Sequence, residues 1–495
     1  MSIFNNNLLA GAAAQGGTTP VHTIDQSIRF NDNDSAYLKK DYGSDGSQTT
    51  FTLSGWLKLG ILTGTAHCLF STGFINGSAA DFTLYFSGNQ LKFFGGYNGG
   101  LPTNRLETTQ LFRDHSAWYH IVFVADTTNA VSSERLRLYV NGSRVTAFDT
   151  ETYPSQNNTL VWGDATYSHV IGATGDDQAS GPTQTPRFHY DGYMAELVYI
   201  DGTALDPSSF GEYNSSNIWV PKDVSGLTFG TNGFHIKGED SADLGNDSSG
   251  NNNDFTTSGL ASHDQMVGES PTNNFAIANP LDSSYYMGSE TFSEGNLQMT
   301  LGSSVGGLAT MGITSGKWYA EFEVHSDASG TTYFIIGIYG DQPTSTQHFV
   351  GYTSNSYGYY ALNGNSYTNF TSSSYGNSYT VGDVVGVAVD LDNNKLYFSK
   401  NGTFQNSGDP TSGATGTGAI SINSVSSTGL GAYFIASSSA SSTPSGHTIN
   451  YNFGQDGTFA GNVTAGGNSD SNGIGNFKYS VPSGYLALCT KNLGS

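Results

Sequence analysis

The densest set of potential ligand contacts in the sequence lies between Tyr352 and Tyr379. Eight aromatic residues alternate there with Ser, Asn, Gly and Thr. Aromatic rings offer rigid faces on which sugar rings stack, and Asn and Ser offer adaptable hydrogen bonds, the mixture that antibody paratopes use. The tract predicts a binding surface, and its expected ligand-binding residues are Tyr357, Tyr360, Tyr367, Phe370 and Tyr375. The alternative is that several of these tyrosines are core residues of β-strands.

A second set of residues, all aspartates, could bind a hard cation. Asp164, Asp176, Asp177 and Asp191 fall in or beside loops of one stretch of the chain. Carboxylate oxygens suit Ca²⁺, although the spacing does not match an EF-hand loop. Calcium is therefore the candidate metal, and solvated acidic loops are the alternative. No other cofactor is expected.

Arrangements of residues that could perform catalysis are sparse. Asp191 and Glu196 are five positions apart, so on a regular strand they face opposite sides, whereas Glu321 and Glu323 share a face that we expect to be exposed and polar. The 11 histidines form no HExxH motif and no His/Asp/Ser arrangement. Cys68 and Cys489 are interpreted as free structural thiols. The sequence predicts that the protein is not an enzyme.

The composition narrows the function classes further. The chain has 495 residues, of which 13% are aromatic and 12% charged, and its net charge is 18 − 41 = −23. High aromatic content excludes a disordered chain, and 18 dispersed Lys and Arg residues argue against a nucleic-acid partner. The apolar runs are too short to insert in a membrane. The first residues lack the basic and apolar regions of a signal peptide, which predicts assembly in a cytoplasm.

The elements that must position these residues are short β-strands. Leu136, Leu138 and Val140 lie on one face of an alternating run that leads into Asn141-Gly142, a pair typical of a type I′ hairpin turn. The run at 395–399, which precedes a second Asn-Gly pair, repeats this pattern. No amphipathic helix of three turns is evident. The pattern predicts an all-β protein built from antiparallel two-layer sandwiches.

The organisation along the chain follows from changes in composition. We expect an N-terminal arm at 1–20, a β-sandwich at 21–220, a connector with short strands at 221–280, a second sandwich at 281–460, and a C-terminal segment at 461–495 that packs on the second domain. The connector is expected because residues 245–254 carry almost nothing to bury and several prolines punctuate the stretch.

The first sandwich resembles the laminin G-like, concanavalin A-like jelly roll over residues 25–215. The segments that carry the resemblance are Ser27-Ile28-Arg29-Phe30, Phe51-Thr52-Leu53-Ser54-Gly55-Trp56, Trp118-Tyr119-His120-Ile121-Val122-Phe123, Leu138-Tyr139-Val140-Asn141-Gly142 and Asp191-Gly192-Tyr193-Met194-Ala195-Glu196. The resemblance implies an antiparallel concanavalin-like sandwich, and domains of this kind often bind calcium at a sheet rim.

The second sandwich resembles a SPRY domain over residues 290–455. The matching segments are Gly316-Lys317-Trp318-Tyr319-Ala320-Glu321-Phe322-Glu323, Val381-Gly382-Asp383-Val384-Val385-Gly386-Val387-Ala388-Val389-Asp390, Lys395-Leu396-Tyr397-Phe398-Ser399-Lys400-Asn401-Gly402 and Ile449-Asn450-Tyr451-Asn452-Phe453-Gly454. The two resemblances together imply two concanavalin-like jelly-roll domains joined by a polar connector.

The N-terminal start is Phe4-Asn5-Asn6-Asn7-Leu8-Leu9, and the connector contains Thr272-Asn273-Asn274-Phe275-Ala276. Together with these segments, the pairing of the two domains resembles virion-associated proteins of tailed phages of aquatic bacteria. The similarity implies a virion protein, and we expect a fibre- or appendage-like adhesin that binds a host-surface glycan or protein. A passive capsid or tail decoration protein is the alternative, and a glycan depolymerase the second. We expect other virion proteins to dock on residues 1–20 or on the connector, and a homo-oligomer, a trimer in a fibre.

Overall fold

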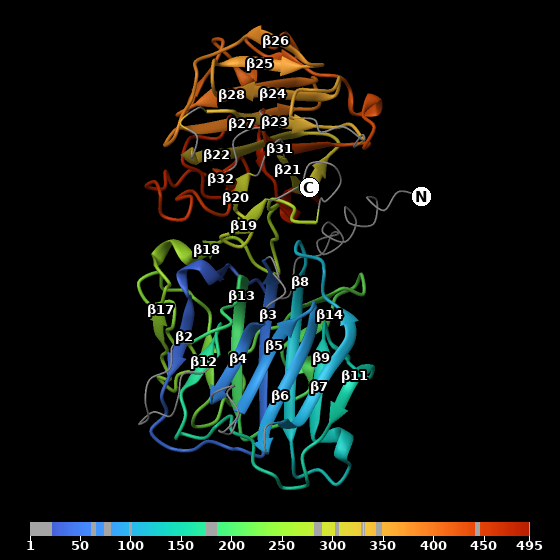
Figure 1. Ribbon diagram of the computed structural model, residues 1–495, viewed down its shortest axis with the longest axis vertical. Helices are drawn as coiled ribbons and strands as arrows, with labels where there is room; N and C mark the ends of the chain where they lie inside the picture. The colour runs from blue at the N-terminus through green and yellow to red at the C-terminus, as the bar shows by residue number, and fades with distance from the viewer. Residues whose placement is uncertain are drawn as a thin grey trace. The chain divides into compact units, whose positions relative to one another are not determined.

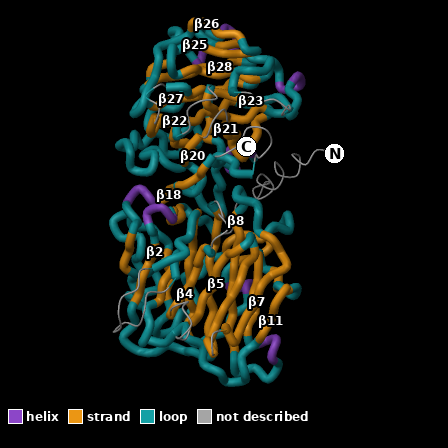
Figure 2. Tube along the Cα trace, viewed as in Figure 1, coloured by secondary structure: helices purple, strands orange, loops and turns teal. Residues whose placement is uncertain are grey.

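The described chain divides into two compact units, the N-terminal sandwich up to Thr272 and the C-terminal sandwich from Asn273. The computed structural model describes residues 22–60, 66–73, 81–98, 101–174, 186–281, 290–301, 306–327, 330, 332–342, 349–440 and 446–494. The predicted N-terminal arm, 1–20, lies outside them. Strands make up both units, as Figures 1 and 2 show, so the predicted all-β class is confirmed.

Two eight-stranded antiparallel sheets form the N-terminal sandwich. The first sheet has the order β10 (Ser143–Arg144), β9 (Leu136–Val140), β8 (Trp118–Asp126), β3 (Thr50–Leu59), β13 (Gly192–Asp201), β1 (Gln26–Phe30) and β18 (Gln265–Val267), with β16 (Phe234–Ile236) beside β13. The second has the order β11 (Phe148–Thr152), β7 (Leu101–Leu111), β6 (Gln90–Asn98), β5 (Asp81–Ser87), β4 (His67–Gly73), β12 (His169–Ile171), β2 (Tyr37–Lys40) and β17 (Thr256–Ser258). A separate pair joins β14 (Gly211–Tyr213) and β15 (Trp219–Pro221).

Aromatic rings fill the core between these two sheets. Phe82 contacts Phe93 and Trp162 with ring centroids 5.0 and 5.3 Å apart, and Phe93 lies 4.7 Å from Phe123. All four side chains are fully buried. Such pairs contribute roughly 0.5–1.5 kcal/mol each beyond the burial of their area. Alternating aromatic and polar residues on the strands thus become the inner and outer faces of the sheets.

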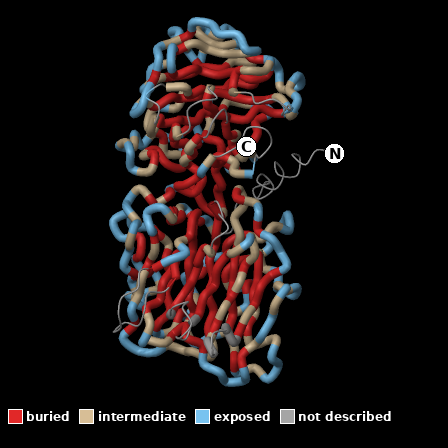
Figure 3. The backbone as a smooth tube through the Cα atoms, viewed as in Figure 1, coloured by how far each residue is buried: buried red, intermediate tan, exposed pale blue. Residues whose placement is uncertain are grey.

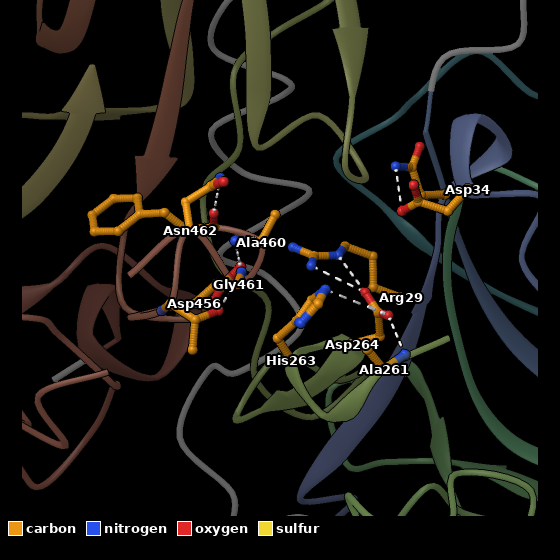
Figure 4. A network of polar contacts seen from close by, with 12 residues as sticks. Arg29, Asp34, Ala261, His263, Asp264, Asp456, Ala460, Gly461 and Asn462 are labelled. Carbon is orange, nitrogen blue, oxygen red and sulfur yellow. Dashed lines mark hydrogen bonds and ion pairs between the residues drawn. The ribbon is translucent and has the colours of Figure 1, made fainter. Parts of the chain in front are cut away.

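The segment at 221–280, predicted as a connector, is for most of its length part of the N-terminal sandwich. β16, β17 and β18 extend its two sheets by pairing with β13, β2 and β1. Buried ion pairs fix the same segment: Arg29 contacts Asp264 at 3.1 Å, and Lys58 contacts Glu269 at 3.1 Å. Figure 4 shows Arg29 against Asp264, whose carboxylate also accepts the Ala261 amide. The boundary between the units therefore falls after Thr272 and not at residue 220.

The C-terminal sandwich has a nine-stranded and a six-stranded sheet. The nine-stranded sheet has the order β19 (Thr291–Ser293), β20 (Gln298–Leu301), β32 (His447–Asn452), β22 (Lys317–Asp327), β27 (Val384–Asp390), β28 (Lys395–Lys400) and β29 (Thr403–Phe404), with β30 (Ile420–Ser421) on β28 and β33 (Leu486–Ala487) parallel to β22. The six-stranded sheet has the order β21 (Gly306–Ile313), β31 (Tyr433–Ser439), β23 (Phe334–Tyr339), β24 (Ser356–Tyr360), β25 (Asn365–Thr368) and β26 (Thr371–Ser374).

The C-terminal segment 461–495 packs on the nine-stranded sheet. Phe477, Tyr485 and Cys489 join Tyr319 and Tyr397 in one buried cluster on that sheet's outer face. The thiols of Cys68 and Cys489 are buried and free.

Helices in the described chain are short. They are η1 (Asp32–Asp34), η2 (Ser132–Glu134), η3 (Pro207–Ser209), η4 (Ser262–Asp264), η5 (Pro410–Thr415), η6 (Val425–Ser427) and α2 (Thr490–Leu493). Within the described residues, no helix has the length and apolar character needed to cross a membrane.

Candidate functional site: an aromatic patch on the six-stranded sheet

The predicted aromatic tract occupies the last three strands of the six-stranded sheet, and two of its five predicted ligand-binding residues are core residues. Tyr357 is 4% exposed and its hydroxyl accepts the Asn423 amide at 2.9 Å. Tyr375 is 7% exposed and its hydroxyl accepts the Phe398 amide at 3.0 Å. Both rings are packed inside the sandwich, so they do not reach a ligand, and the prediction is corrected for these two residues.

The other three predicted residues come together with Tyr352, the first residue of the predicted tract, and with Phe349, which precedes the tract. Tyr360, Tyr367 and Phe370 lie with Phe349 and Tyr352 in one cluster, which we call the aromatic patch. Ring centroids are 5.4 Å apart for Tyr360 and Tyr367, and 5.0 Å apart for Tyr352 and Phe370. Phe349 lies 6.1 Å from both Tyr367 and Phe370. Tyr360 is itself buried, at 8% exposed, in a cluster with Ile335 and Val350, so the prediction is corrected for this residue too. Tyr367 is half-buried and Phe370 is 65% exposed, and these two predicted residues remain accessible.

The strand register places part of this patch on the outer face of the sheet. Gly358 pairs with Tyr367, and Tyr367 pairs with Ser372 of β26. A Cβ at Gly358 would lie 2.9 Å from the Val350 carbonyl oxygen, so glycine is required where the segment at 349–355 crosses the sheet. The Val350 amide is fixed there by the Ser438 hydroxyl at 2.9 Å. This crossing segment supplies Phe349 and Tyr352. Tyr352 belongs to the predicted tract, whereas Phe349 lies before it and could not be assigned to the patch from local strand patterning.

The most exposed ring, Phe370, is held in a costly backbone conformation. Asn369 and Phe370 form the two-residue turn between β25 and β26, with φ of 48° and 54°. A positive φ is common for Asn but is an outlier for a bulky residue, and it costs roughly 1–2 kcal/mol. The Asn369 and Phe370 amides donate to the carbonyl groups of Thr353 and Gly351 at 3.0 and 3.1 Å. The fold therefore fixes a solvent-exposed aromatic ring against local strain, a feature that clusters at binding sites.

The electrostatics of the patch are those of a neutral surface. From Phe349 to Gly382 the sequence contains no Asp, Glu, Lys, Arg or His. Burial, followed by the neighbouring Tyr367 and Tyr333 hydroxyls, raises the pKa of Tyr360 to about 12. Its phenol is accordingly uncharged at physiological pH, and the exposed hairpin is lined by Ser, Thr and Asn. Figure 3 shows this exposure along the β25–β26 hairpin.

The predicted calcium ligands do not form a site within the described chain. The Asp164 carboxylate accepts the Thr166 amide at 2.8 Å in a local turn, and Asp191 is fully buried beneath Gly60. Asp176 and Asp177 lie outside the described residues. Among the residues that are described, no group of three or more His, Cys, Asp or Glu side chains is placed to hold a metal ion. Calcium binding stays a prediction.

The carboxylates considered for catalysis have structural partners. Glu321 and Glu323 share a face as predicted, but both side chains are buried, and the C-terminal segment covers Glu321. Glu321 accepts the amides of Lys478 and Tyr479, both at 2.8 Å. Burial raises the pKa of each glutamate to about 7. On β13, Glu196 sits at a bulge and contacts the His235 ring at 2.7 Å.

The structure also reveals a serine–histidine pair that the sequence spacing did not indicate. Ser54 Oγ lies 2.9 Å from His120 Nε2 because β3 and β8 are neighbours. The indole N–H of Trp219 donates to His120 Nδ1 at 3.0 Å, which places the imidazole proton on Nε2, facing the serine. Burial lowers the pKa of His120 to about 3. A neutral imidazole that donates to the hydroxyl is the reverse of the general-base geometry.

The strand order and registers define a protein of two antiparallel β-sandwich units. Family comparison agrees with both: residues 31–183 match the concanavalin A-like lectin/glucanases superfamily, and residues 317–423 match the SPRY domain family. The chain thus contains a concanavalin A-like lectin/laminin G domain followed by a SPRY domain, and the predicted fold class is confirmed.

Several solved structures resemble parts of the chain at low identity. The SPRY domain of human HERC1 is 21% identical and covers 31% of this chain and 87% of that one, with a TM-score of 0.25. A heptameric SAP-like pentraxin from Limulus polyphemus is 17% identical, with 37% and 79% coverage and a TM-score of 0.27. A human SPRY domain is 16% identical, with 36% and 95% coverage and a TM-score of 0.23. No curated protein sequence matches the chain significantly.

Proposed function

We propose that this chain is a non-enzymatic adhesin of a tailed-phage virion, part of a fibre or appendage, which binds a bacterial surface glycan or protein through the aromatic patch. A concanavalin A-like lectin domain suggests carbohydrate binding, and a SPRY domain suggests protein binding. The observation that carries the binding part of the proposal is Phe370, a 65% exposed aromatic residue in a left-handed turn. The virion role rests on the resemblance described above. Exposed apolar groups that form a contiguous patch mark interaction sites.

The absence of catalysis is part of the same proposal. Glu321 accepts hydrogen bonds from backbone amides of the C-terminal segment, and Glu323 accepts one from the Asn450 side-chain amide at 2.8 Å. The Ser54–His120 pair has the tautomer that disfavours attack by the serine. Both arrangements support a structural role for groups that could otherwise perform hydrolysis. Each contact with a host surface would be weak, and many copies on one particle would supply the affinity.

The test is adsorption of the purified full-length chain to a panel of aquatic bacterial isolates. We expect binding to at least one isolate, with a loss of about tenfold or more in Tyr367→Ala and Phe370→Ala. Val381→Ala is the matched control, since Val381 is 46% exposed, uncharged and outside the patch. Unchanged adsorption in both aromatic variants would remove the patch from the function. A chain that binds phage particles but no cells would instead favour the decoration role.

A further inference from the structure

We propose that the ligand of the aromatic patch is an uncharged glycan, an inference that rests on the binding function proposed above. The argument begins with the charge-free stretch from Phe349 to Gly382, in a chain that carries 41 acidic and 18 basic residues. This stretch supplies every ring of the patch. A ligand that depended on ion pairing would therefore find no ionic partner within the segment that forms the surface.

Three charged residues in the described part of the chain, Asp341, Asp383 and Lys400, contact this stretch and are engaged within the protein. The Asn355 side chain donates to Asp341 at 2.6 Å. Lys400 forms an ion pair with Asp383 at 3.0 Å and also donates to the Ser378 carbonyl at 2.8 Å. These charges support the loops behind the patch. The net charge of −23 also repels anionic ligands at long range, so an acidic polysaccharide is disfavoured.

The side chains beside the rings match the hydrogen-bonding capacity of sugar hydroxyls. Tyr367 on β25 faces Ser372 on β26, and Asn365 faces Ser374 in the same register. Successive alternate residues share a face, so Asn365, Tyr367 and both serines lie on one side of the hairpin. Hydroxyl and amide groups both donate and accept, as sugar hydroxyls do, while Tyr367 offers a ring for stacking. All four are half-buried or exposed, and none carries a charge.

The edge position of this hairpin leaves room for an extended polymer. Among the described strands, β26 is the last of its sheet, and each of its residues, Thr371 to Ser374, is exposed. Phe370 stands at the turn that ends the hairpin, so stacking and hydrogen-bonding groups follow one another along about four residues of strand, roughly 13 Å. That span accommodates several sugar units and favours a chain-like glycan.

The experiment is affinity electrophoresis of the full-length chain through gels containing a defined polysaccharide. The neutral probes are dextran, a β-1,3-glucan and a galactan, and the anionic probes are alginate and polygalacturonate. We expect retardation by at least one neutral probe, unchanged up to about 0.5 M NaCl because no ion pair is screened. Retardation should weaken about tenfold or more in Tyr367→Ala and Phe370→Ala but not in Val381→Ala.

Three results would overturn the inference: no retardation by any neutral probe, binding restricted to anionic probes or weakened by salt, or neutral binding that Phe370→Ala leaves intact. Adsorption to cells separates these failures from failure of the proposed function. If Phe370→Ala abolishes cell adsorption while the neutral probes do not bind, the adhesin function stands and a protein ligand replaces the glycan. If Phe370→Ala adsorbs normally, both proposals fall.

Discussion

The outer faces of the two sheets of the C-terminal sandwich are covered to different extents. On the nine-stranded sheet, Tyr319 and Tyr397 are fully buried because Phe477 and Tyr485 of the C-terminal segment pack over them. On the six-stranded sheet, the crossing segment at 349–355 leaves Tyr367 half-buried and Phe370 exposed. Both faces are rich in tyrosine. The difference lies in how much of each face the covering segment buries: residues 349–355 bury Tyr360 but leave Phe370 exposed.

The N-terminal sandwich follows the covered pattern on its β3–β8–β13 face. Phe210, Val224 and Phe229 pack there against Val122 and Val198. Ion pairs from the segment that contains β18 add to this cover, with Lys58 and Glu269 both completely buried. Covered faces gain stability from burial, whereas a face left open with aromatic side chains gains none from that area and is available for binding. Four changes would break or sharpen this contrast.

Lys58→Met should have the largest effect, because it leaves the buried Glu269 carboxylate without its cation. Glu269 would keep the indole N–H of Trp118 at 2.9 Å, but breaking one side of a buried ion pair costs roughly 3–5 kcal/mol. Urea unfolding followed by tryptophan fluorescence measures the loss. Lys237→Met is the matched control, since its pair with Glu239 is exposed and contributes about 1 kcal/mol or less. Equal effects of the two variants would contradict the importance of the covered face.

The pH dependence of stability should come next in size, and it should depend on Glu321. Burial raises the pKa of this carboxyl from 4.5 to about 7, so the folded state binds a proton more tightly than the unfolded state. Stability is then highest below pH 4.5 and falls as the pH rises through 7, by roughly 3 kcal/mol for this group. Unfolding free energies measured from pH 5 to 8 should fall less steeply in Glu321→Gln. Parallel curves for the two proteins would contradict the assignment.

The strands, the face on which each strand residue lies and the hairpin turns could be predicted from the sequence. Leu136, Leu138 and Val140 all point into the core, as alternation predicted. Asn141 and Asn401, the first residues of the two predicted Asn-Gly turns, adopt φ of 47° and 48°, so local chemistry determined these hairpins. These features depend only on neighbours along the chain, which is why they could be predicted.

Exposure could not be predicted in the same way, because it depends on remote segments. Glu321 and Glu323 do share a face, but both are buried, and residues near 478 cover Glu321. Tyr375 and Tyr367 have similar local sequence, yet Tyr375 is buried against β28 and Tyr367 lies on the open face. To predict whether a strand residue is buried, one must know which face of the sheet is covered. Periodicity only assigns each residue to one of the two faces. The calcium and oligomer predictions depend on contacts of the same remote kind.

Tyr375→Phe should produce a smaller loss that separates the two tyrosines of the tract. The variant removes the hydroxyl that accepts the buried Phe398 amide, and an unsatisfied buried donor costs roughly 1–3 kcal/mol. Tyr367→Phe should change stability by about 0.5 kcal/mol or less, because its ring is half-buried on the open face. Urea unfolding of both variants measures the contrast. A larger loss from Tyr367→Phe would mean that the open face contributes to the core.

Phe370→Gly should have the smallest effect and the opposite sign. Glycine adopts the positive φ of this turn without the steric cost of a Cβ, which releases roughly 1–2 kcal/mol, while the extra freedom of the unfolded chain removes about 0.4–1 kcal/mol of that gain. We therefore expect a rise in stability of up to about 1.6 kcal/mol, together with loss of adsorption, because the exposed ring is gone. A drop in stability would show that Phe370 contributes to packing through its 5.0 Å contact with Tyr352. Stability gained as binding is lost would mark this turn as a position held in strain for its ligand.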